Sequence, residues 1–527
     1  MDRLKSLLLL LSILLFIFPF SNAQNQSIEW QKCIGGTKED AAYQIIETSD
    51  GGYLTVGITF SNDYDAIENH SLSTDLFVVK LSMEGSVEWT RCLGGTGGEF
   101  YPVVVEIMDG GYLISAITRS NDGDVSGFNG NVSEWTFDAW IVKIDNYGNI
   151  IWQKCYGGTE DDHARSIIQT SDGGFVFAGY TLSIDGDLLN LNFYENSQQG
   201  WIVKIDSIGT IQWQKLIGGT GEDLLTSIQL TDDGGFIVAG VTSSHDGDVI
   251  GNNGIESAWV VKLSNTGTIQ WQKCIGSGSF SRVTDIKQCS YGGYIVACEK
   301  MNSVGNGMLY SQGYVIKLNN SGDIEWEKQL GGTRDDYLNT IHETVDGGFI
   351  IGGSTGSWDG DLQGTTYLGG EDFWIVKLSK FGDVEWQRRF GGNNTDLLYS
   401  LQQTTDLGYI LAGRTKSNNY DVSGLHPSLT SYIYSDMWIV KLSPSVSVEL
   451  FENVESIQIY PIPAQDYLYL QVDLSLLNHT FVIYSINGQQ VFSGVVTTET
   501  MELHLGFLSD GIYLLKIGSQ TQKFVKL

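Results

Sequence analysis

The stretch DAWIVKIDNYGNIIWQKCYGG, residues 138–158, decides the fold because similar stretches recur along the chain. Residues 140–144 alternate large apolar and polar side chains, which is the period of a β-strand. Gly148 permits a tight turn, and residues 150–155 return as a second strand, so the stretch predicts a β-hairpin. The same pattern surrounds Trp89, Trp213, Trp271, Trp326 and Trp386, and its second half surrounds Trp30. Successive tryptophans lie 55 to 63 residues apart, which predicts a repeat architecture.

One repeat contains four strand patterns, at residues 165–170, 175–181, 201–206 and 211–217. Four strands joined by short turns cannot bury a core alone, and this is typical of one blade of a β-propeller. The strand that follows a Gly-Gly or Leu-Gly turn begins with an aromatic residue in every repeat, at Tyr53, Tyr112, Phe175, Phe236, Tyr294, Phe349 and Tyr409. The sequence therefore predicts an all-β protein with a seven-bladed propeller of four-stranded blades.

The two ends of the repeat region complement each other. The region begins with a lone fourth strand, residues 27–34, and its last repeat has three strands, at 397–404, 409–415 and 437–443. We expect the N-terminal strand to complete the last blade and close the ring without an exposed edge. The third and fourth strands, WIVKLSxxGxIxWQK, resemble the blades of quinoprotein-type propellers, which implies that the fourth-strand tryptophan docks between blades.

Residues on either side of the repeats have other compositions. Arg3 and Lys5 precede an apolar run and a small-residue cleavage site, so residues 1–23 are predicted to be a signal peptide rather than an uncleaved membrane anchor. The propeller is expected over residues 24–443 and a linker over 444–453. Residues 454–527 alternate strands with Asn-Gly and Asp-Gly turns and predict a small β-sandwich of about seven strands.

The composition agrees with an exported β protein. The chain has 64 glycines and a formal charge of −32, which repels nucleic acid and anionic membranes and favours cationic or neutral ligands, or simply solubility. Four of the six cysteines occupy one repeat position in different blades, too far apart for disulfides. All six are expected to be small buried apolar residues.

Acidic loops are the main candidate site in the propeller. The fourth-to-first and the second-to-third connections share one face of such a fold, and most of the longer second-to-third connections contain Asp-x-Asp. Carboxylates two residues apart on a glycine-containing loop suit calcium, whereas an Asx-turn is the structural alternative. The candidate calcium ligands are Asp122, Asp124, Asp185, Asp187, Asp246, Asp248, Asp359 and Asp361, and Asp63 and Asp65 share the pattern. No other cofactor is indicated.

Aromatic residues on the same loops suit a sugar-binding or protein-binding face. They are Phe128, Trp135, Phe193, Tyr194, Trp358, Tyr367, Tyr432 and Tyr434. The chain lacks nucleophile-elbow, phosphate-loop and dinucleotide-binding motifs, so catalysis is not favoured and no catalytic residue is assigned. The acidic pairs leave a glycoside hydrolase open as the alternative.

The C-terminal 75 residues or so resemble the type A C-terminal sorting domain of the type IX secretion system of Bacteroidota. The resemblance rests on Tyr460, Pro461, Pro463, Gly488, Gly511, Tyr513 and Lys526 in their motifs, although Ile462 replaces the usual Asn. It implies export through the periplasm, contact with the secretion machinery, and a surface-bound or released product. The repeats likewise resemble those of exported propeller proteins, some of which carry enzyme names such as endoglucanase. The expected function is an exported binding or adhesion scaffold with a glycan or protein ligand and no stable membrane insertion.

Overall fold

The computed structural model describes residues 26–70, 73–131, 134–194, 197–276, 281–304, 308–429, 431–444, 457–472, 476–486, 489–498, 500–517 and 520–527. The predicted signal peptide and residues 445–453 of the predicted linker lie outside the described residues. The chain divides into two compact units, residues 1–445 and 446–527.

The described part of the first unit forms seven antiparallel sheets of four strands each. The first three blades comprise β2 (Asp40–Glu47), β3 (Tyr53–Thr59), β4 (Asp75–Leu81) and β5 (Val87–Leu93); β6 (Glu99–Glu106), β7 (Tyr112–Thr118), β8 (Asp138–Ile144) and β9 (Ile150–Tyr156); and β10 (Asp162–Gln169), β11 (Phe175–Thr181), β12 (Gln199–Ile205) and β13 (Ile211–Ile217). The next three comprise β14 (Asp223–Leu230), β15 (Phe236–Thr242), β16 (Ser257–Leu263) and β17 (Ile269–Ile275); β18 (Ser281–Gln288), β19 (Tyr294–Val304), β20 (Met308–Leu318) and β21 (Ile324–Leu330); and β22 (Asp336–Glu343), β23 (Phe349–Thr355), β24 (Asp372–Leu378) and β25 (Val384–Phe390). The seventh comprises β26 (Asp396–Gln403), β27 (Tyr409–Thr415), β28 (Asp436–Leu442) and β1 (Ile28–Ile34).

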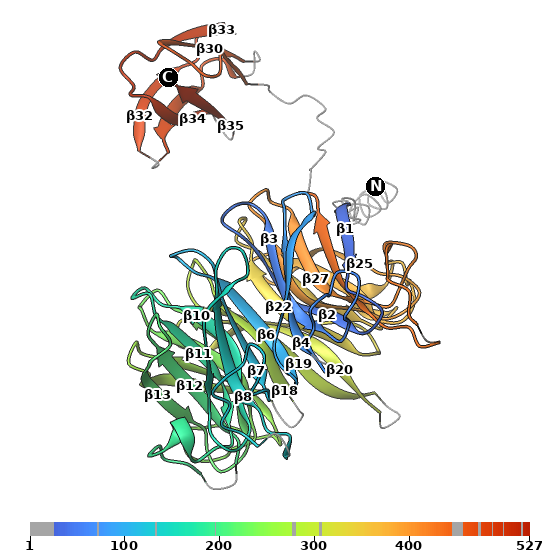
Figure 1. The fold of residues 1–527 in the computed structure, drawn as a ribbon. Coiled ribbons are helices and arrows are strands. Elements are labelled where there is room, and N and C mark those ends of the chain that lie inside the picture. Colours follow the sequence, from blue (N-terminus) through green and yellow to red (C-terminus); the bar gives the residue numbers. More distant parts are fainter. Residues whose placement is uncertain are drawn as a thin grey trace, which may run out of the picture. The chain divides into compact units, whose positions relative to one another are not determined.

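The first strands of successive blades form the inner wall of the ring. β2 contacts β6, β6 contacts β10, and the series continues through β14, β18 and β22 to β26, which contacts β2 again. Each blade therefore packs on two neighbours, and the predicted seven-bladed propeller is confirmed for the described residues. In Figure 1 the blue strand β1 and the orange strand β27 lie in the same part of the ring, as the shared sheet requires.

The N-terminal strand closes this ring as predicted. β1 pairs with β28 antiparallel, from Ile28 opposite Leu442 to Ile34 opposite Met437. Trp438 Nε1 donates a hydrogen bond of 2.8 Å to Gln31 Oε1. Trp140 and Gln153 make the same bond within the continuous second blade. The seal between the chain ends thus reproduces an ordinary third-to-fourth strand pairing.

Tryptophans pack the blades together. The fourth-strand tryptophan contacts the aromatic residue that begins the second strand of the next blade, as in Trp30 with Tyr53 and Trp271 with Tyr294, whose ring centroids lie 5.7 Å apart in both pairs. This confirms the expected docking between blades. All six cysteines are free; four are buried, while Cys155 and Cys274 are half-buried.

Blade five departs from the repeat. Residues 301–312, at the place of its second-to-third connection, lack the Asp-x-Asp pattern. Instead β19 and β20 extend to eleven residues each and pair as far as Val304 opposite Met308. The Asp-x-Asp motif that bonds the preceding connection in most other blades is absent there, and the chain continues the hairpin.

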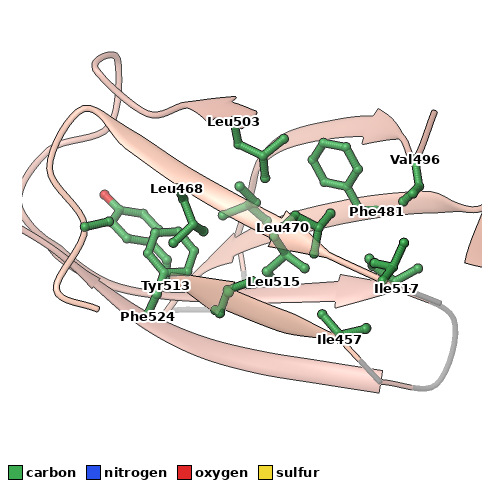
Figure 2. Close-up of a cluster of buried hydrophobic side chains, with 14 of the residues drawn as sticks. Ile457, Leu468, Leu470, Phe481, Val496, Leu503, Tyr513, Leu515, Ile517 and Phe524 are labelled. Atoms are coloured by element: carbon green, nitrogen blue, oxygen red, sulfur yellow. The ribbon is translucent and has the colours of Figure 1, made fainter. Parts of the chain in front are cut away.

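The second unit is a sandwich of seven strands. One sheet contains β29 (Gln458–Tyr460), β30 (Tyr467–Gln471) and β33 (Thr500–His504), and the other contains β31 (Thr480–Ser485), β32 (Gln490–Val495), β34 (Gly511–Ile517) and β35 (Gln520–Lys526). Figure 2 shows the buried side chains between the sheets, among them Leu470, Phe481 and Leu515. Alternate residues of β30 and β34 supply much of this core, as the sequence period requires.

Candidate functional site: the loop face and the axial pocket

The Asp-x-Asp loops fasten one connection of the propeller to another. In blade three, Asp185 accepts hydrogen bonds from Thr159 N at 2.8 Å and Thr159 Oγ1 at 3.0 Å. Asp187 accepts one from Gly157 N at 3.1 Å. A short 3-10 helix at the motif, η2 (Gly186–Leu188), has a counterpart in blade six, η3 (Gly360–Leu362). Both connections therefore lie on one face, called the loop face below, as predicted.

The other predicted aspartates repeat this arrangement. The first aspartate of the pair bonds the threonine 26 residues before it, and the second bonds the glycine 30 residues before it. These bonds are made by Asp122 and Asp124, Asp246 and Asp248, Asp359 and Asp361, and also by Asp63 and Asp65.

Calcium at these loops stays a prediction. Two carboxylates whose oxygens already accept protein hydrogen bonds would supply few of the six to eight oxygens that calcium takes. The described residues contain no group of three or more His, Cys, Asp or Glu side chains placed to hold a metal. The hydrogen bonds give the aspartates a structural role of their own, and a calcium-dependent rise in melting temperature would add a second one.

A deeper carboxylate lies at the start of six inner strands, and sequence reasoning did not single it out. Asp162 is fully buried and accepts hydrogen bonds from Gly158 N and Ser183 Oγ, both at 2.7 Å, and from Thr181 Oγ1. The equivalent residues are Asp40, Glu99, Asp223, Asp336 and Asp396, and blade five has Ser281. Burial raises the pKa of Asp162, Asp40 and Glu99 to about 7.

Two histidines join neighbouring blades through carboxylates. His426 Nδ1 lies 2.8 Å from Asp436 in blade seven, and its Nε2 lies 3.8 Å from Asp65 in blade one. His70 is placed in the same way between Asp75 and Asp124 of blades one and two. The hydrogen bond to Asp436 raises the pKa of His426. Burial lowers the pKa of His70, but its bond to Asp75 and the negative charges of Asp75 and Asp124 together outweigh burial, and the net shift is upward.

These groups give the propeller an unusual pH dependence. A buried acid with a raised pKa binds a proton more readily in the folded than in the unfolded chain, and so does each bridging histidine, so stability falls as pH rises. We expect the melting temperature of the mature protein to be a few degrees higher at pH 6 than at pH 8. Differential scanning calorimetry measures this; Asp162→Asn should flatten the profile, and a melting temperature that rises from pH 6 to pH 8 would contradict it.

The inner strands carry a ring of bulged residues around the propeller axis. In each first strand the pairing register shifts at one place, and the extra residue is left out of the ladder. We call these residues the axial collar: Tyr43, Tyr101 with Pro102, Arg165, Thr226, Thr284, Asn339 and Tyr399. A bulge redirects a side chain out of the regular alternation, and here it directs seven positions toward one hollow.

The collar lines a pocket on the axis, of about 490 Å³. Its wall also includes Gln198, Glu222 and Glu256, which directly precede third or first strands, so this axial pocket lies at the loop-face end of the ring. A second hollow shares most of the collar and continues along the inner strands to Ile46 and Gln402. The two hollows therefore adjoin each other along the inner strands.

The two sides of the collar differ in chemistry. Tyr399 stacks on Tyr43 with centroids 5.2 Å apart, and Tyr43 meets Tyr101 edge-on at 6.1 Å. The Arg165 guanidinium lies 3.9 Å from the Tyr101 ring centroid. Across the pocket, Thr226 and Asn339 donate to backbone carbonyls of the next blade, which fixes them in structural bonds. The side chains open to a ligand thus form an aromatic arc that ends in a cation.

A pattern in the repeats could have revealed the collar. The residue three positions after the start of the first strand varies between blades, as Tyr43, Pro102, Arg165, Thr226, Thr284, Asn339 and Tyr399, and its neighbours in the first strand vary as well. Variation inside an otherwise regular repeat indicates that the blades differ along their first strands, where the collar lies.

The loop aromatics have several placements. Trp135 and Trp358 are exposed, each with an arginine over its ring, Arg119 at 3.5 Å and Arg334 at 3.9 Å. Tyr367 meets Trp358 edge-on, and Tyr432 meets Tyr434 edge-on. Phe193 packs against the core of blade three, while Phe128 is half-buried and Tyr194 exposed. A binding role for these side chains stays a prediction.

The motif residues of the second unit gather around Lys526. Gly511 pairs with Lys526, and Ala464, directly after Pro463, forms a bridge with it. The Lys526 ammonium lies 3.8 Å from Asp466. Tyr513 is buried, and its hydroxyl group donates a hydrogen bond of 2.8 Å to Ser509 O. Tyr460, the residue before Pro461, stacks on Tyr469. Gly488 lies outside the described residues, and the part that each residue plays in sorting stays a prediction.

The fold and this C-terminal unit define an exported β-propeller protein. Residues 458–527 match the secretion system C-terminal sorting domain, and the unit is a sorting domain of the type IX system. The chain is therefore exported by that machinery, with which the domain interacts, to the cell surface or the medium. In the described parts of the chain, no helix has the length and apolar character needed to cross a membrane.

Other similarities are distant. The chain is 25% identical over 159 residues to the regulatory protein FlaEY of Caulobacter vibrioides, which is 29% of this chain and 16% of that protein. The Pan2 WD40 domain of Neurospora crassa matches 79% of this chain and 95% of its own, at 11% identity and a TM-score of 0.40. PorZ of Porphyromonas gingivalis, a surface component of the type IX secretion system, matches over 92% of this chain and 81% of the PorZ chain, at 10% identity and a TM-score of 0.25. The fold assignment rests on the sheets themselves.

Proposed function

We propose that the exported propeller is a binding protein that holds the end of a glycan in the axial pocket. The observation that carries the proposal is the axial collar, in which the bulge of each first strand turns side chains toward a single pocket. Ligand pockets combine apolar walls with a few polar groups that fix orientation. Here the tyrosine arc offers ring faces and edges to the C–H faces of a sugar, and the arginine and glutamates offer partners for its hydroxyl groups.

A glycan titration of the mature protein tests this function. Tyr101 is 39% exposed at the pocket wall, and Tyr101→Ala is expected to weaken binding about tenfold, since that factor corresponds to about 1.4 kcal/mol and an aromatic contact is of this size. Tyr147 is an exposed tyrosine in a third-to-fourth strand turn, away from the loop face, so Tyr147→Ala is the matched control. Equal loss in both variants, or no binding of any glycan, would refute the proposal.

A glycoside hydrolase is the second candidate because of one residue in the same pocket. Burial raises the pKa of Glu299 to about 7, the range in which a carboxyl can act as general acid. Hydrolysis would appear as turnover of the bound glycan. Glu299→Gln would then abolish turnover while leaving binding in place, whereas a pure binding protein shows uptake without products.

A further inference from the structure

In the axial pocket, aromatic rings hold the guanidinium of Arg165 in place, but no described carboxylate pairs with it. Its guanidinium lies over the Tyr101 ring at 3.9 Å, with the Tyr180 ring centroid at 6.0 Å. Tyr180 is in turn fixed by a 3.0 Å hydrogen bond to His163. The Arg165 Nε atom is buried without a hydrogen-bond partner, and among the described residues no carboxylate forms an ion pair with this arginine.

The remaining charges of the pocket and of the second hollow are paired, shifted by burial or exposed at the rim. Arg282 lies 3.3 Å from Glu256, and Lys287 lies 2.9 Å from Asp285. Burial keeps His342 neutral by lowering its pKa to about 4. Burial raises the pKa of Glu299 to about 7, and Glu222 is exposed at the rim. Among the cations of the described wall, Arg165 is thus the one that lacks a carboxylate partner.

We propose that Arg165 anchors a carboxylate and that the ligand of the axial pocket is an acidic glycan, one with a uronic acid at its end. The proposal rests on the binding function proposed above and specifies its ligand class. A guanidinium presents two parallel N–H groups that match the two oxygens of a carboxylate. Tyr101 holds its plane, so little conformational entropy remains to be lost when the ligand binds.

The tyrosine arc accounts for the sugar part of this ligand. Tyr43, Tyr101 and Tyr399 follow Arg165 around the wall, so a ring whose carboxylate reaches the guanidinium would lie along the arc. The net charge of −32 opposes an anion at long range, but salt screens exposed charges beyond about 8 Å. The pocket chemistry therefore decides the ligand class at contact distance.

Isothermal titration of the mature protein with trigalacturonate and with its methyl ester tests the assignment, because the ester keeps the ring and removes the charge. The wild type is expected to bind the acid at least tenfold more tightly than the ester. Arg165→Gln should abolish this preference, and Arg165→Lys, which keeps the charge without the planar fork, should retain part of it. Arg388, stacked on Phe390 outside the pocket, gives the matched control Arg388→Gln, expected to keep the full preference.

The outcomes separate the two proposals. Equal affinity of the wild type for acid and ester, an undiminished preference in Arg165→Gln, or binding of neutral glycans without either trimer would overturn the carboxylate assignment while glycan binding stands. Absence of binding to every glycan would overturn both. Melting curves of the variants, expected to match the wild type within a degree or two, show that a lost preference is not lost folding.

Discussion

Removal of residues 24–35 from the mature chain is expected to abolish the cooperatively folded propeller. The deletion takes away β1, so β28 becomes an open edge whose unpaired backbone groups favour aggregation. It also removes Ile34, which is fully buried against the first blade. We expect soluble aggregates or insoluble protein in place of a monomer, measured by size-exclusion chromatography and calorimetry. A monomer with a wild-type melting temperature would contradict this.

Two variants show whether ring closure is the cause. Ile34→Ala is expected to cost about 2–5 kcal/mol of unfolding free energy, the range for buried large-to-small changes, while the half-buried Ile28→Ala costs far less. Ser443 N donates to Ser27 O, just as Asp145 N donates to Asn149 O across the turn of blade two. A permuted chain that starts at Thr37 and carries residues 27–36 behind Ser443 through an Asn-Tyr-Gly turn should therefore fold. Its failure would show that the strand is needed for more than its place beside β28.

Asp162→Ala is expected to be the most damaging single substitution on the loop face. It leaves the Gly158 amide and the Thr181 and Ser183 hydroxyl groups without their acceptor in a buried place. A stranded donor costs about 1–3 kcal/mol, so we expect a loss of roughly 3–5 kcal/mol in chemical denaturation. Asp162→Asn, which keeps one acceptor oxygen, should lose less.

The matched control is Asp185→Ala on the surface side of the same connection. Asp185 is half-buried and its donors on Thr159 regain water when it is removed, so we expect about 1 kcal/mol. A loss in Asp185→Ala as large as in Asp162→Ala would refute the assignment of the buried acid as the main anchor. Repeating the denaturation of Asp185→Ala with calcium and with chelator also tests the calcium prediction.

Local patterns were enough to predict the architecture. The period-two alternation of WIVKI and the turn glycine Gly148 specify each hairpin from neighbouring residues, and the repeat multiplies them. The strand at Trp30 stands alone before the first complete repeat, and the last repeat lacks its fourth strand. Ring closure could therefore be predicted by counting strands. Each C-terminal motif likewise spans only a few residues. Such features depend on short separations in the chain, where sequence determines geometry directly.

The site was harder to predict because its parts come from all the blades. The spacing of the aspartates on the acidic loops predicted calcium ligands. The hydrogen-bond partners of Asp185 and Asp187 lie on another connection, and the sequence alone does not show whether those bonds form. The buried Asp162 was hidden among the other acids of its loop, since burial is a property of the assembled blade. Blade five has Ser281 in place of the buried acid and an extended β19–β20 hairpin in place of the Asp-x-Asp loop. The buried acid and the Asp-x-Asp motif are therefore absent from the same blade.

The sequence by itself determined the strands, the number of blades, the closing strand and the export domain, because each is encoded by short-range periodicity or a compact motif. The tertiary structure alone decided the axial pocket. One bulged residue from each inner strand is brought to the axis from positions about sixty residues apart, and the bulge, not the strand pattern, sets its direction. The side chains that surround Arg165 come from several blades of the closed ring. The sequence therefore did not show whether a carboxylate pairs with this arginine, and the tertiary structure did.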